Sequence, residues 1–289
     1  MILERERERE RKIYLRFSNT DIKKFKKLPK NIYILTYSFP CQDLSQQGKQ
    51  KGISKDTRSG LLYEIERILK NNKDRLPKVL LLENVKALTT KKFIKDFENW
   101  IKILNELGYV TKWKVLNSSD YNSFQNRERV FAISYLNKNS NFEFPNKIIN
   151  NKDLSQLINI NNEGKELSNL LSYKKTEFYK TNKGIFKSKF INYSKFNSEA
   201  YLYLPKGLGP TLTASGANSR LKFYFESEQI IKTMDELEAY QYMGFNLDDA
   251  IAVKSTKLLS REKMIFTCGN SISVEVLEAL FEEIIKKCL

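Results

Sequence analysis

The sequence predicts an α/β fold, because short buried strands alternate with amphipathic helices along its first half. Apolar residues at helical spacing predict helices at 60–70 and 93–104. This alternation implies a mostly parallel sheet that helices cover on both faces. Apolar runs rich in β-forming residues predict the strands at 32–37, 79–82, 112–116 and 130–134.

Changes in composition and periodicity divide the chain into four parts. In the first part Glu and Arg alternate from Glu4 to Arg11, which is typical of a short solvated helix. The last part begins with a capping box at Thr233–Glu236 and closes on an amphipathic helix. The parts are a charged N-terminal extension (1–30), the α/β part (31–140), a part rich in Asn, Lys and Ser (141–220) and a regular final part (221–289).

The net charge of the chain favours a polyanionic partner, most simply nucleic acid, because it is +16 at neutral pH. A composition rich in Lys, Asn and Ile is also typical of an AT-rich genome, so the charge supports this interpretation without establishing it. Within 173–196, lysines are interleaved with aromatic residues, a pattern suited to phosphates and bases. An irregular region with its own aromatic core is the alternative.

Several kinds of chemistry are excluded by what the sequence lacks. It has no histidine, which excludes a Ser-His-Asp triad, a histidine-ligated metal and a histidine general base within this chain. Cys41, Cys268 and Cys288 show no CxxC spacing, so we expect no disulfide framework and no metal site, and we expect a reducing cytoplasm. No apolar run approaches the roughly 18 residues of a membrane span, so no membrane contact is expected.

Cys41 follows the first predicted strand, in the segment Ser38-Phe-Pro-Cys-Gln42. Loops beyond the carboxyl ends of strands bind ligands in open α/β sheets, and a cysteine held there by a rigid proline is well placed as a nucleophile. A small buried apolar residue is the alternative interpretation of a lone cysteine.

Glu83 comes directly after the second predicted strand, where a carboxylate is costly to bury unless it is paired or used. It lies beside Cys41 if the two strands are neighbours. Arg127 and Arg129 alternate on an extended segment, so they point to the same side and can grip an acceptor atom or orient a thiolate. The alternatives are a strand-end cap for Glu83 and a surface salt bridge for the arginines.

Four motifs in this order resemble those of the cytosine-5 DNA methyltransferases. They are Pro-Cys-Gln, Glu-Asn-Val, Gln-x-Arg-x-Arg and, after a variable region, Gly269-Asn-Ser271. The segments Tyr37–Ser45 and Gly209–Arg220 look most like the bacterial CpG-specific members. The resemblance implies a Rossmann-like S-adenosylmethionine-dependent methyltransferase sheet, formed by 31–140 and 221–289, with a small target-recognition region at 141–220.

The resemblance also implies a mechanism on double-stranded DNA. A cytosine is flipped out of the duplex, and the Cys41 thiolate adds to its C6 atom. Glu83 would hold and protonate N3, Arg129 would bind O2, and Arg127 would position and help to ionise Cys41. The methyl group passes from S-adenosylmethionine to C5, and loss of the C5 proton releases the enzyme.

The same resemblance implies the residues that hold the two substrates. Gln42 would fill the space left by the flipped base, and the 211–220 loop with the basic region before it would read the sequence. The residues expected to line the cofactor are Pro40, Leu61, Asn270 and Ser271. The other expected DNA contacts are Ser45, Thr213, Ser215 and Arg220.

The Phe-x-Gly-x-Gly cofactor loop of the family has no match, since the first glycine is Gly48, and neither do the two acidic strand ends that follow it. We therefore expect the first strands of the sheet to be missing and the chain alone to have little or no activity. Three explanations are open. A second chain supplies the loop, or a frameshift removed it, which the slippage-prone Glu-Arg repeat favours, or the chain is a remnant that binds DNA without methylating it.

An RNA cytosine methyltransferase is an alternative within the same fold, because one tRNA-modifying branch keeps Pro-Cys-Gln and Glu-Asn-Val. The long variable region before Thr211 argues for DNA. Nucleotide hydrolysis is not expected, since the sequence has no Gly-x-x-x-x-Gly-Lys loop.

Overall fold

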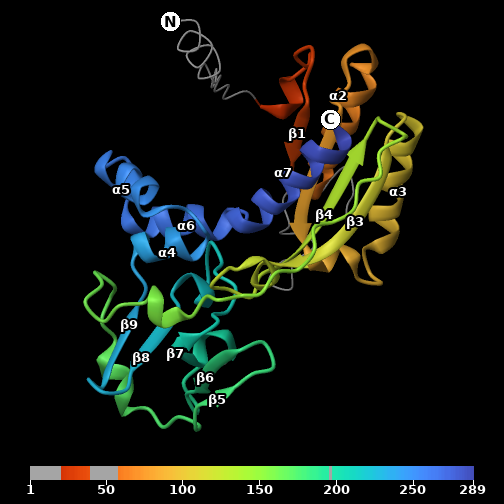
Figure 1. Cartoon of the computed structure of the whole chain (residues 1–289). Helices are drawn as coiled ribbons and strands as arrows, with labels where there is room; N and C mark the ends of the chain where they lie inside the picture. The colour runs from red at the N-terminus through yellow and green to blue at the C-terminus, as the bar shows by residue number, and fades with distance from the viewer. Residues whose placement is uncertain (1–20, 40–57, 195–196) are drawn as a thin grey trace, which may run out of the picture.

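The computed structural model describes residues 21–39, 58–194 and 197–289. These residues form two lobes, one built on a four-stranded sheet and the other on a five-stranded sheet (Figure 1). The chain completes most of the first lobe, builds the second, and returns to the first with its last helix.

The first sheet has the strand order β1-β2-β4-β3, and all four predicted strand positions are confirmed. β1 and β2 are parallel, whereas β4 is antiparallel to both of its neighbours. The expectation of a mostly parallel sheet is therefore wrong for the described strands, because a short connection and not a crossover helix joins β3 to β4. The strands are β1 (Ile34–Tyr37), β2 (Val79–Val85), β3 (Val110–Asn117) and β4 (Glu128–Tyr135).

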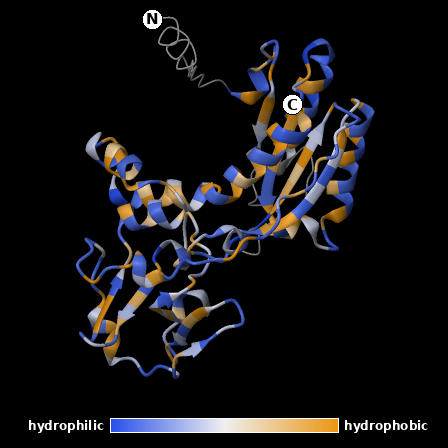
Figure 2. Cartoon of the chain, in the orientation of Figure 1, coloured by the Kyte–Doolittle hydropathy of each residue, from blue (hydrophilic) through white to orange (hydrophobic). Residues whose placement is uncertain are grey.

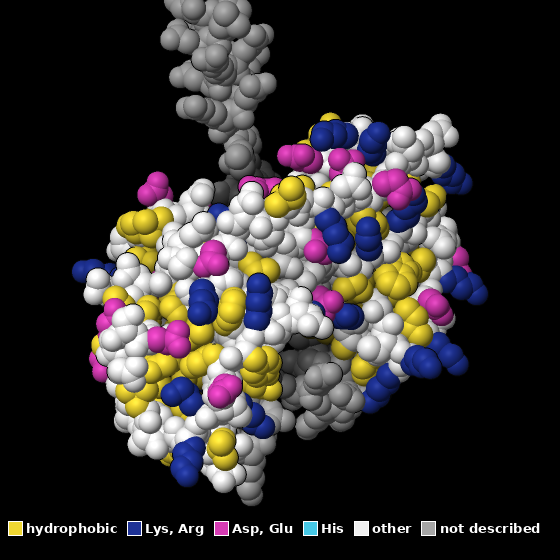
Figure 3. Space-filling model, turned by 60° about the horizontal axis from the view of Figure 1, so that its bottom comes forward, with side chains coloured by type: hydrophobic (Ala, Val, Ile, Leu, Met, Phe, Trp, Pro, Cys, Tyr) yellow, Lys and Arg dark blue, Asp and Glu magenta, His cyan; other side chains and the backbone are white. Residues whose placement is uncertain are grey.

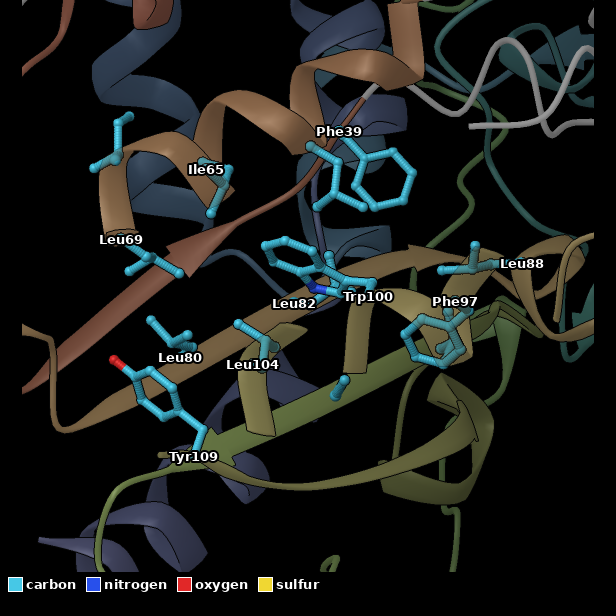
Figure 4. Packing of buried hydrophobic residues seen from close by; sticks show 14 of the residues in the cluster. Phe39, Ile65, Leu69, Leu80, Leu82, Leu88, Phe97, Trp100, Leu104 and Tyr109 are labelled. Carbon is cyan, nitrogen blue, oxygen red and sulfur yellow. The ribbon is translucent and has the colours of Figure 1, made fainter. Parts of the chain in front are cut away.

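Helices cover both faces of this sheet, as the alternating pattern predicts. α2 (Leu62–Lys70) and α3 (Ile94–Glu106) pack on one face, and α7 (Val274–Cys288) packs on the other. Successive residues of β2 serve opposite cores, since side chains alternate across a strand. In Figure 4, Leu80 and Leu82 of β2 lie among the side chains of α2 and α3, with Trp100 near the centre.

Residues 21–30, which we assigned to the charged extension, pack on the first lobe through Asn72. This side chain is buried, and its Oδ1 accepts from the Leu28 amide at 3.0 Å. Its Nδ2 donates to the Lys26 carbonyl at 2.9 Å and to the Ile68 carbonyl at 2.8 Å. Asn72 thereby closes the end of α2 and holds the incoming chain beside it.

Replacing Asn72 with alanine is expected to destabilise the chain by about 2 kcal/mol, because a buried amide and two carbonyls lose their partner. The measurement is the denaturant midpoint of unfolding at constant m-value. Asn71→Ala is the matched control, since Asn71 is exposed. Equal losses in the two variants would contradict the role given to Asn72.

The second sheet has the order β5-β6-β7-β8-β9, with β7 and β8 parallel and the other pairs antiparallel. The boundary expected at residue 220 falls inside this sheet, between β7 and β8. The strands are β5 (Tyr179–Lys180), β6 (Ile185–Lys189), β7 (Tyr201–Gly207), β8 (Lys222–Phe225) and β9 (Ile230–Thr233).

Three helices pack against the second sheet: α4 (Glu236–Tyr242), α5 (Leu247–Ser255) and α6 (Arg261–Asn270). The capping box of α4 is formed by Asp235 and Glu238, each of which accepts from the amide of the other. The box expected at Thr233–Glu236 is therefore wrong by two residues. The shift arises because Thr233 is still paired in β9.

The last two helices together, Arg261–Cys288, are long and apolar enough to span a membrane by length and composition alone. This is weak evidence, since the core helix of a globular protein passes the same test. Val276, Leu280 and Ile284 of α7 are buried against the first sheet, and Figure 2 shows polar residues between the apolar ones along this helix. The apolar residues of α7 thus form part of the core.

Candidate active site

The end of β1 is tied to the end of β2 by two side-chain hydrogen bonds. Ser38 Oγ donates to the Glu83 carbonyl at 2.8 Å, and Asn84 Nδ2 donates to the Phe39 carbonyl at 3.1 Å. Both Phe39 and Asn84 are buried. The chain is therefore fixed at the carboxyl end of the sheet up to two residues before Cys41.

Four residues singled out in the sequence lie outside the described residues: Pro40, Cys41, Gln42 and Ser45. Their roles as cofactor contact, nucleophile and DNA contacts stay predictions. The neighbouring strand β2 is described, and its last residues lie beside the end of β1.

Glu83 lies within β2, because the strand continues to Val85 and not only to Leu82 as expected. Its side chain is 13% exposed, and its Oε1 lies 3.2 Å from Arg129 Nε. Arg129 Nη1 also donates to the Glu128 carbonyl at 2.8 Å, which orients the guanidinium. Glu83 and Arg129 thus form a largely buried ion pair at the end of the sheet.

Burial raises the pKa of Glu83, and the positive charges of Arg129 and Arg127 offset only part of this effect. A carboxyl group with a raised pKa keeps its proton to higher pH and can deliver it to a ring nitrogen. Arg129 remains charged and presents planar N–H donors. The pair can therefore recognise a heterocycle that carries adjacent nitrogen and oxygen acceptors.

Arg127 is 4% exposed, and its guanidinium joins three segments that are distant in the sequence. Nη1 donates to the Leu212 carbonyl at 2.7 Å, and Nη2 donates to the carbonyls of Gly269 at 3.1 Å and Ser271 at 2.7 Å. The surface-salt-bridge alternative is therefore wrong for Arg127. It lies between the lobes, close enough to Glu83 to lower the pKa of that carboxyl.

Gln125 holds the same junction, and the sequence indicated it only as part of a motif. It is fully buried, its Nε2 donates to the Tyr242 carbonyl at 2.9 Å, and its Oε1 accepts from the Leu212 amide at 3.2 Å. The Tyr242 hydroxyl donates to the Pro210 carbonyl at 2.6 Å. Glutamine is usually exposed, so composition alone does not predict that Gln125 is buried. Its place in the Gln-x-Arg-x-Arg motif was the only sequence signal of a structural role.

Three of the expected cofactor residues, Leu61, Asn270 and Ser271, lie within the described part of the chain. Ser271 directly follows α6, and its carbonyl accepts a hydrogen bond from Arg127. Arg127 precedes β4, whose first residues pair with the last residues of β2. Asn270 is exposed at the end of α6, and Leu61 is half-buried at the start of α2. Ligands of open α/β sheets bind at the carboxyl ends of the strands.

Gly269 joins the cofactor edge to the expected DNA-reading loop. A Cβ at this position would lie 2.2 Å from both the Ala214 amide nitrogen and the Thr213 carbonyl carbon. Only glycine allows two backbones to approach this closely, so α6 and the 211–220 loop pack as one unit.

The loop itself is held by its own hydrogen bonds. The Thr213 amide donates to the Asn218 carbonyl at 3.2 Å, and Thr213 Oγ1 donates to the Ser215 carbonyl at 2.8 Å. The side chains of Ser215 and Arg220 are exposed, and Arg220 Nη2 lies 3.8 Å from Glu199 Oε1. Such a long, exposed ion pair leaves the guanidinium available for a stronger anionic partner.

Four of the described aromatic residues between 173 and 194 belong to the core of the second lobe, as the alternative interpretation had it, whereas Tyr173 and Tyr179 are exposed. Phe190 is buried, and Phe178 stacks on Tyr224 with ring centroids 5.8 Å apart. Lysines lie over these rings, with Lys187 Nζ 3.9 Å from the centroid of Tyr201. In Figure 3, Lys and Arg side chains lie on both lobes at the sides of the hollow between them.

The class of the protein follows from a comparison with known families. The model of the C-5 cytosine-specific DNA methylase family matches residues 9–286, so the chain belongs to that family. It is a DNA cytosine methyltransferase by homology.

Two relatives are similar over most of the chain. The orphan methyltransferase M.SssI of Spiroplasma monobiae is 50% identical over 264 residues, which cover 90% of this chain and 67% of that protein. The Type II methyltransferase M2.ScrFI of Lactococcus lactis subsp. cremoris is 34% identical over 90% of this chain and 68% of its own length.

Solved structures agree on the fold. The S. pombe Dnmt2 methyltransferase superposes with a TM-score of 0.68 at 17% identity, covering 93% of this chain and 84% of that one. The Entamoeba histolytica methyltransferase EhMeth gives a TM-score of 0.64 at 15% identity, covering 88% and 77%. The S-adenosylmethionine-dependent methyltransferase fold is thereby confirmed.

Proposed function

We propose that this chain, joined by a segment that carries the glycine loop, methylates C5 of cytosine in CpG-containing duplex DNA, with Cys41 as nucleophile and Glu83 and Arg129 as the groups that bind the base. The observation that carries the proposal is the buried Glu83–Arg129 pair, 3.2 Å apart, beside the point where β1 leads to Cys41. Cytosine presents N3 and O2 as adjacent acceptors, which suits one protonated carboxyl and one guanidinium.

The chemistry balances with these groups. Cys41 Sγ forms a bond to C6 of the flipped cytosine, and the C5–C6 electron pair moves into the ring as Glu83 protonates N3. Arg129 donates to O2 and so stabilises the ring during the addition. S-adenosylmethionine, when bound, supplies the methyl group that C5 takes up. Loss of the C5 proton to water then restores the double bond, expels the Cys41 thiolate and returns the N3 proton to Glu83.

The cofactor side of the site is only partly supplied by these 289 residues. Leu61 and Ser271 would line the cofactor, but the glycine loop has no match in the sequence. β1 pairs with β2 on one side, and within the described part of the chain its other edge has no strand partner. We therefore propose that a segment carrying the loop adds to this edge, and that the 289 residues alone transfer little or no methyl.

The CpG assignment rests on the 209–220 segment, whose resemblance to CpG-specific enzymes includes the loop packed against Gly269. The basic side chains on both lobes favour the DNA backbone as a partner. A cytoplasmic location, expected from the cysteine usage, fits this substrate.

The deciding experiment is methyl transfer from labelled S-adenosylmethionine to duplex DNA with and without CpG sites. The chain is assayed alone and after addition of a segment that supplies the glycine loop. We expect label in CpG DNA only after the addition. Full activity of the pure chain would refute the need for the segment, and no activity with DNA binding retained would identify a remnant.

A tRNA substrate belongs in the same assay, because the fold also serves RNA methylation. We expect duplex DNA to be labelled and tRNA not. Preferential labelling of tRNA would overturn the DNA assignment while leaving the roles of Glu83 and Arg129 intact.

A further inference from the structure

The carboxylate of Glu128 joins the two lobes beside the catalytic pair. Its Oε1 lies 3.1 Å from Lys86 Nζ, and its Oε2 lies 3.0 Å from Lys183 Nζ. Lys86 follows β2 in the first lobe, and Lys183 lies in the turn between β5 and β6 in the second. Partial burial raises the pKa of Glu128, but the hydrogen bonds from Lys183 and Lys86 outweigh it, so the pKa is lowered overall.

The turn that carries Lys183 is itself fixed against the Gln-x-Arg-x-Arg motif. Asn126 Nδ2 donates to the Lys183 carbonyl at 2.9 Å, and the Gly184 amide donates to the Thr181 carbonyl at 2.9 Å. Gly184 has a φ of +75°, which favours glycine and allows this tight turn. Both the main chain and the side chain of Lys183 therefore contact the motif.

Glu128 also orients Arg129, the arginine proposed to bind the base. Arg129 Nη1 donates to the Glu128 carbonyl at 2.8 Å, while Arg129 Nε lies 3.2 Å from Glu83. A shift of the Glu128 backbone thus moves a hydrogen-bond acceptor of Arg129. Contacts run without interruption from the turn of the second lobe to the carboxyl group expected to meet the base.

We propose that Glu128 is a positioning residue that couples the second lobe to the Glu83–Arg129 pair through its ion pairs with Lys183 and Lys86. The inference rests on the proposed function, since it assigns the pair to a flipped cytosine. In this arrangement, docking of the β5–β6 turn fixes the geometry of Arg129. DNA that seats the second lobe correctly therefore also completes the base pocket.

The test uses the full chain, no cofactor, and a CpG duplex in which the fluorescent base 2-aminopurine stands 5′ to the target cytosine and unstacks when that cytosine is flipped. Fluorescence reports the flipped base, and anisotropy of the same duplex reports affinity. Glu128→Gln and Lys183→Gln are each expected to lower the flipped fraction at saturation by at least about fivefold. Glu128→Gln should bind DNA as tightly as the parent or more tightly, because a negative charge is removed and two lysines lose their acidic partner.

The matched control is Lys180→Gln, which removes a positive charge from the same hairpin without touching Glu128, since Lys180 lies over the ring of Phe186. It is expected to weaken DNA binding as much as Lys183→Gln does and to leave the flipped fraction unchanged. The Glu128→Gln/Lys183→Gln double variant should be no worse than either single variant, because both break one link. The inference would be overturned if the losses of flipping in the two single variants multiplied in the double variant. It would also be overturned if Lys180→Gln lost as much flipping as Lys183→Gln.

Amide hydrogen exchange on the free chain keeps this test separate from the proposed function. Glu128→Gln and Lys183→Gln should speed exchange both in the 181–184 turn and at the start of β4, whereas Lys180→Gln should not. If the parent binds DNA without flipping the base, the proposed function fails, and the exchange pattern decides the coupling on its own. In that case, unchanged hydrogen exchange at the start of β4 in Glu128→Gln and Lys183→Gln would refute the coupling.

Discussion

Glu83→Gln is expected to lower the rate of methyl transfer by about 10²–10⁴-fold, the usual loss when a general acid is removed. Glutamine has nearly the same shape and can still accept from Arg129, but it has no proton to give to N3. The measurement is kcat for CpG duplex in the presence of the segment that supplies the glycine loop, together with the Kd for DNA. A fall in kcat with an unchanged Kd is the expected pattern.

Glu106→Gln is the control for this variant, because Glu106 is exposed at the end of α3 and far along the chain from the site. It should leave both constants unchanged. If Glu83→Gln kept the parental kcat, the assignment of Glu83 as the proton donor would be refuted.

Glu83 also gives a pH dependence whose sign is fixed by its raised pKa. Between the usual pKa of a glutamate and the raised value, the folded chain holds more protons than the unfolded chain. Stability therefore falls as pH rises through this window, and it is fully restored below it. Relative to Glu83→Gln, which cannot titrate, the parent should lose thermal stability with rising pH. A parent that gained stability over this window would contradict the burial effect.

Cys41→Ser is expected to reduce methyl transfer by at least about 10³-fold, because a serine hydroxyl is a far weaker nucleophile than a thiolate. The other two cysteines are poor candidates for this role. Burial raises the pKa of Cys268 to about 12 and also raises that of Cys288, so both thiols stay neutral. Cys41, which lies outside the described residues, is therefore the remaining candidate for the nucleophile among the three cysteines.

Cys288→Ser is the matched control, since the Cys288 thiol lies 3.6 Å from Ser140 Oγ and a hydroxyl fits the same contact. It should keep the parental kcat. On a duplex with 5-fluorocytosine at the target, whose C5 carries no proton to lose, a DNA adduct that survives denaturation should form with Cys288→Ser in the presence of the loop segment and S-adenosylmethionine, and be absent with Cys41→Ser. Equal adduct formation in both variants would exclude Cys41 as the nucleophile.

Two strands of the first sheet, β2 and β4, could be predicted because they are buried on both faces, and continuous apolar runs such as Val79–Leu82 mark this directly. The extension of β2 through Glu83 and Asn84 could not be predicted from the sequence. Those polar residues stay in the strand because Arg129 and the Phe39 carbonyl, both distant in the sequence, satisfy them. An apolar run carries no sign of strand direction either, so the antiparallel pairing of β4 was missed.

The second sheet was missed because most of its strands are short and every strand carries a lysine among its apolar residues. β6 in addition shifts its register between Ile185 and Lys187, which interrupts the alternation that marks a strand. The site could be predicted only as separate motifs. What brings Arg127, Leu212, Gly269 and Ser271 together is a set of bonds from one guanidinium to main-chain carbonyls, and carbonyls are identical at every position of a sequence.

The contact between Gly269 and the Thr213–Ala214 backbone limits how such an enzyme can be given a new target sequence. Side chains beyond it, at Ser215 and Arg220, are exposed and can be exchanged without meeting α6. The path of the main chain at 213–214 has no such freedom, because any displacement there pushes against the turn that precedes Ser271. Libraries that vary Ser215 and Arg220 while keeping Gly269 and the 213–214 geometry should retain folded variants, whereas insertions at 213–214 should select against cofactor use before they select for a new site.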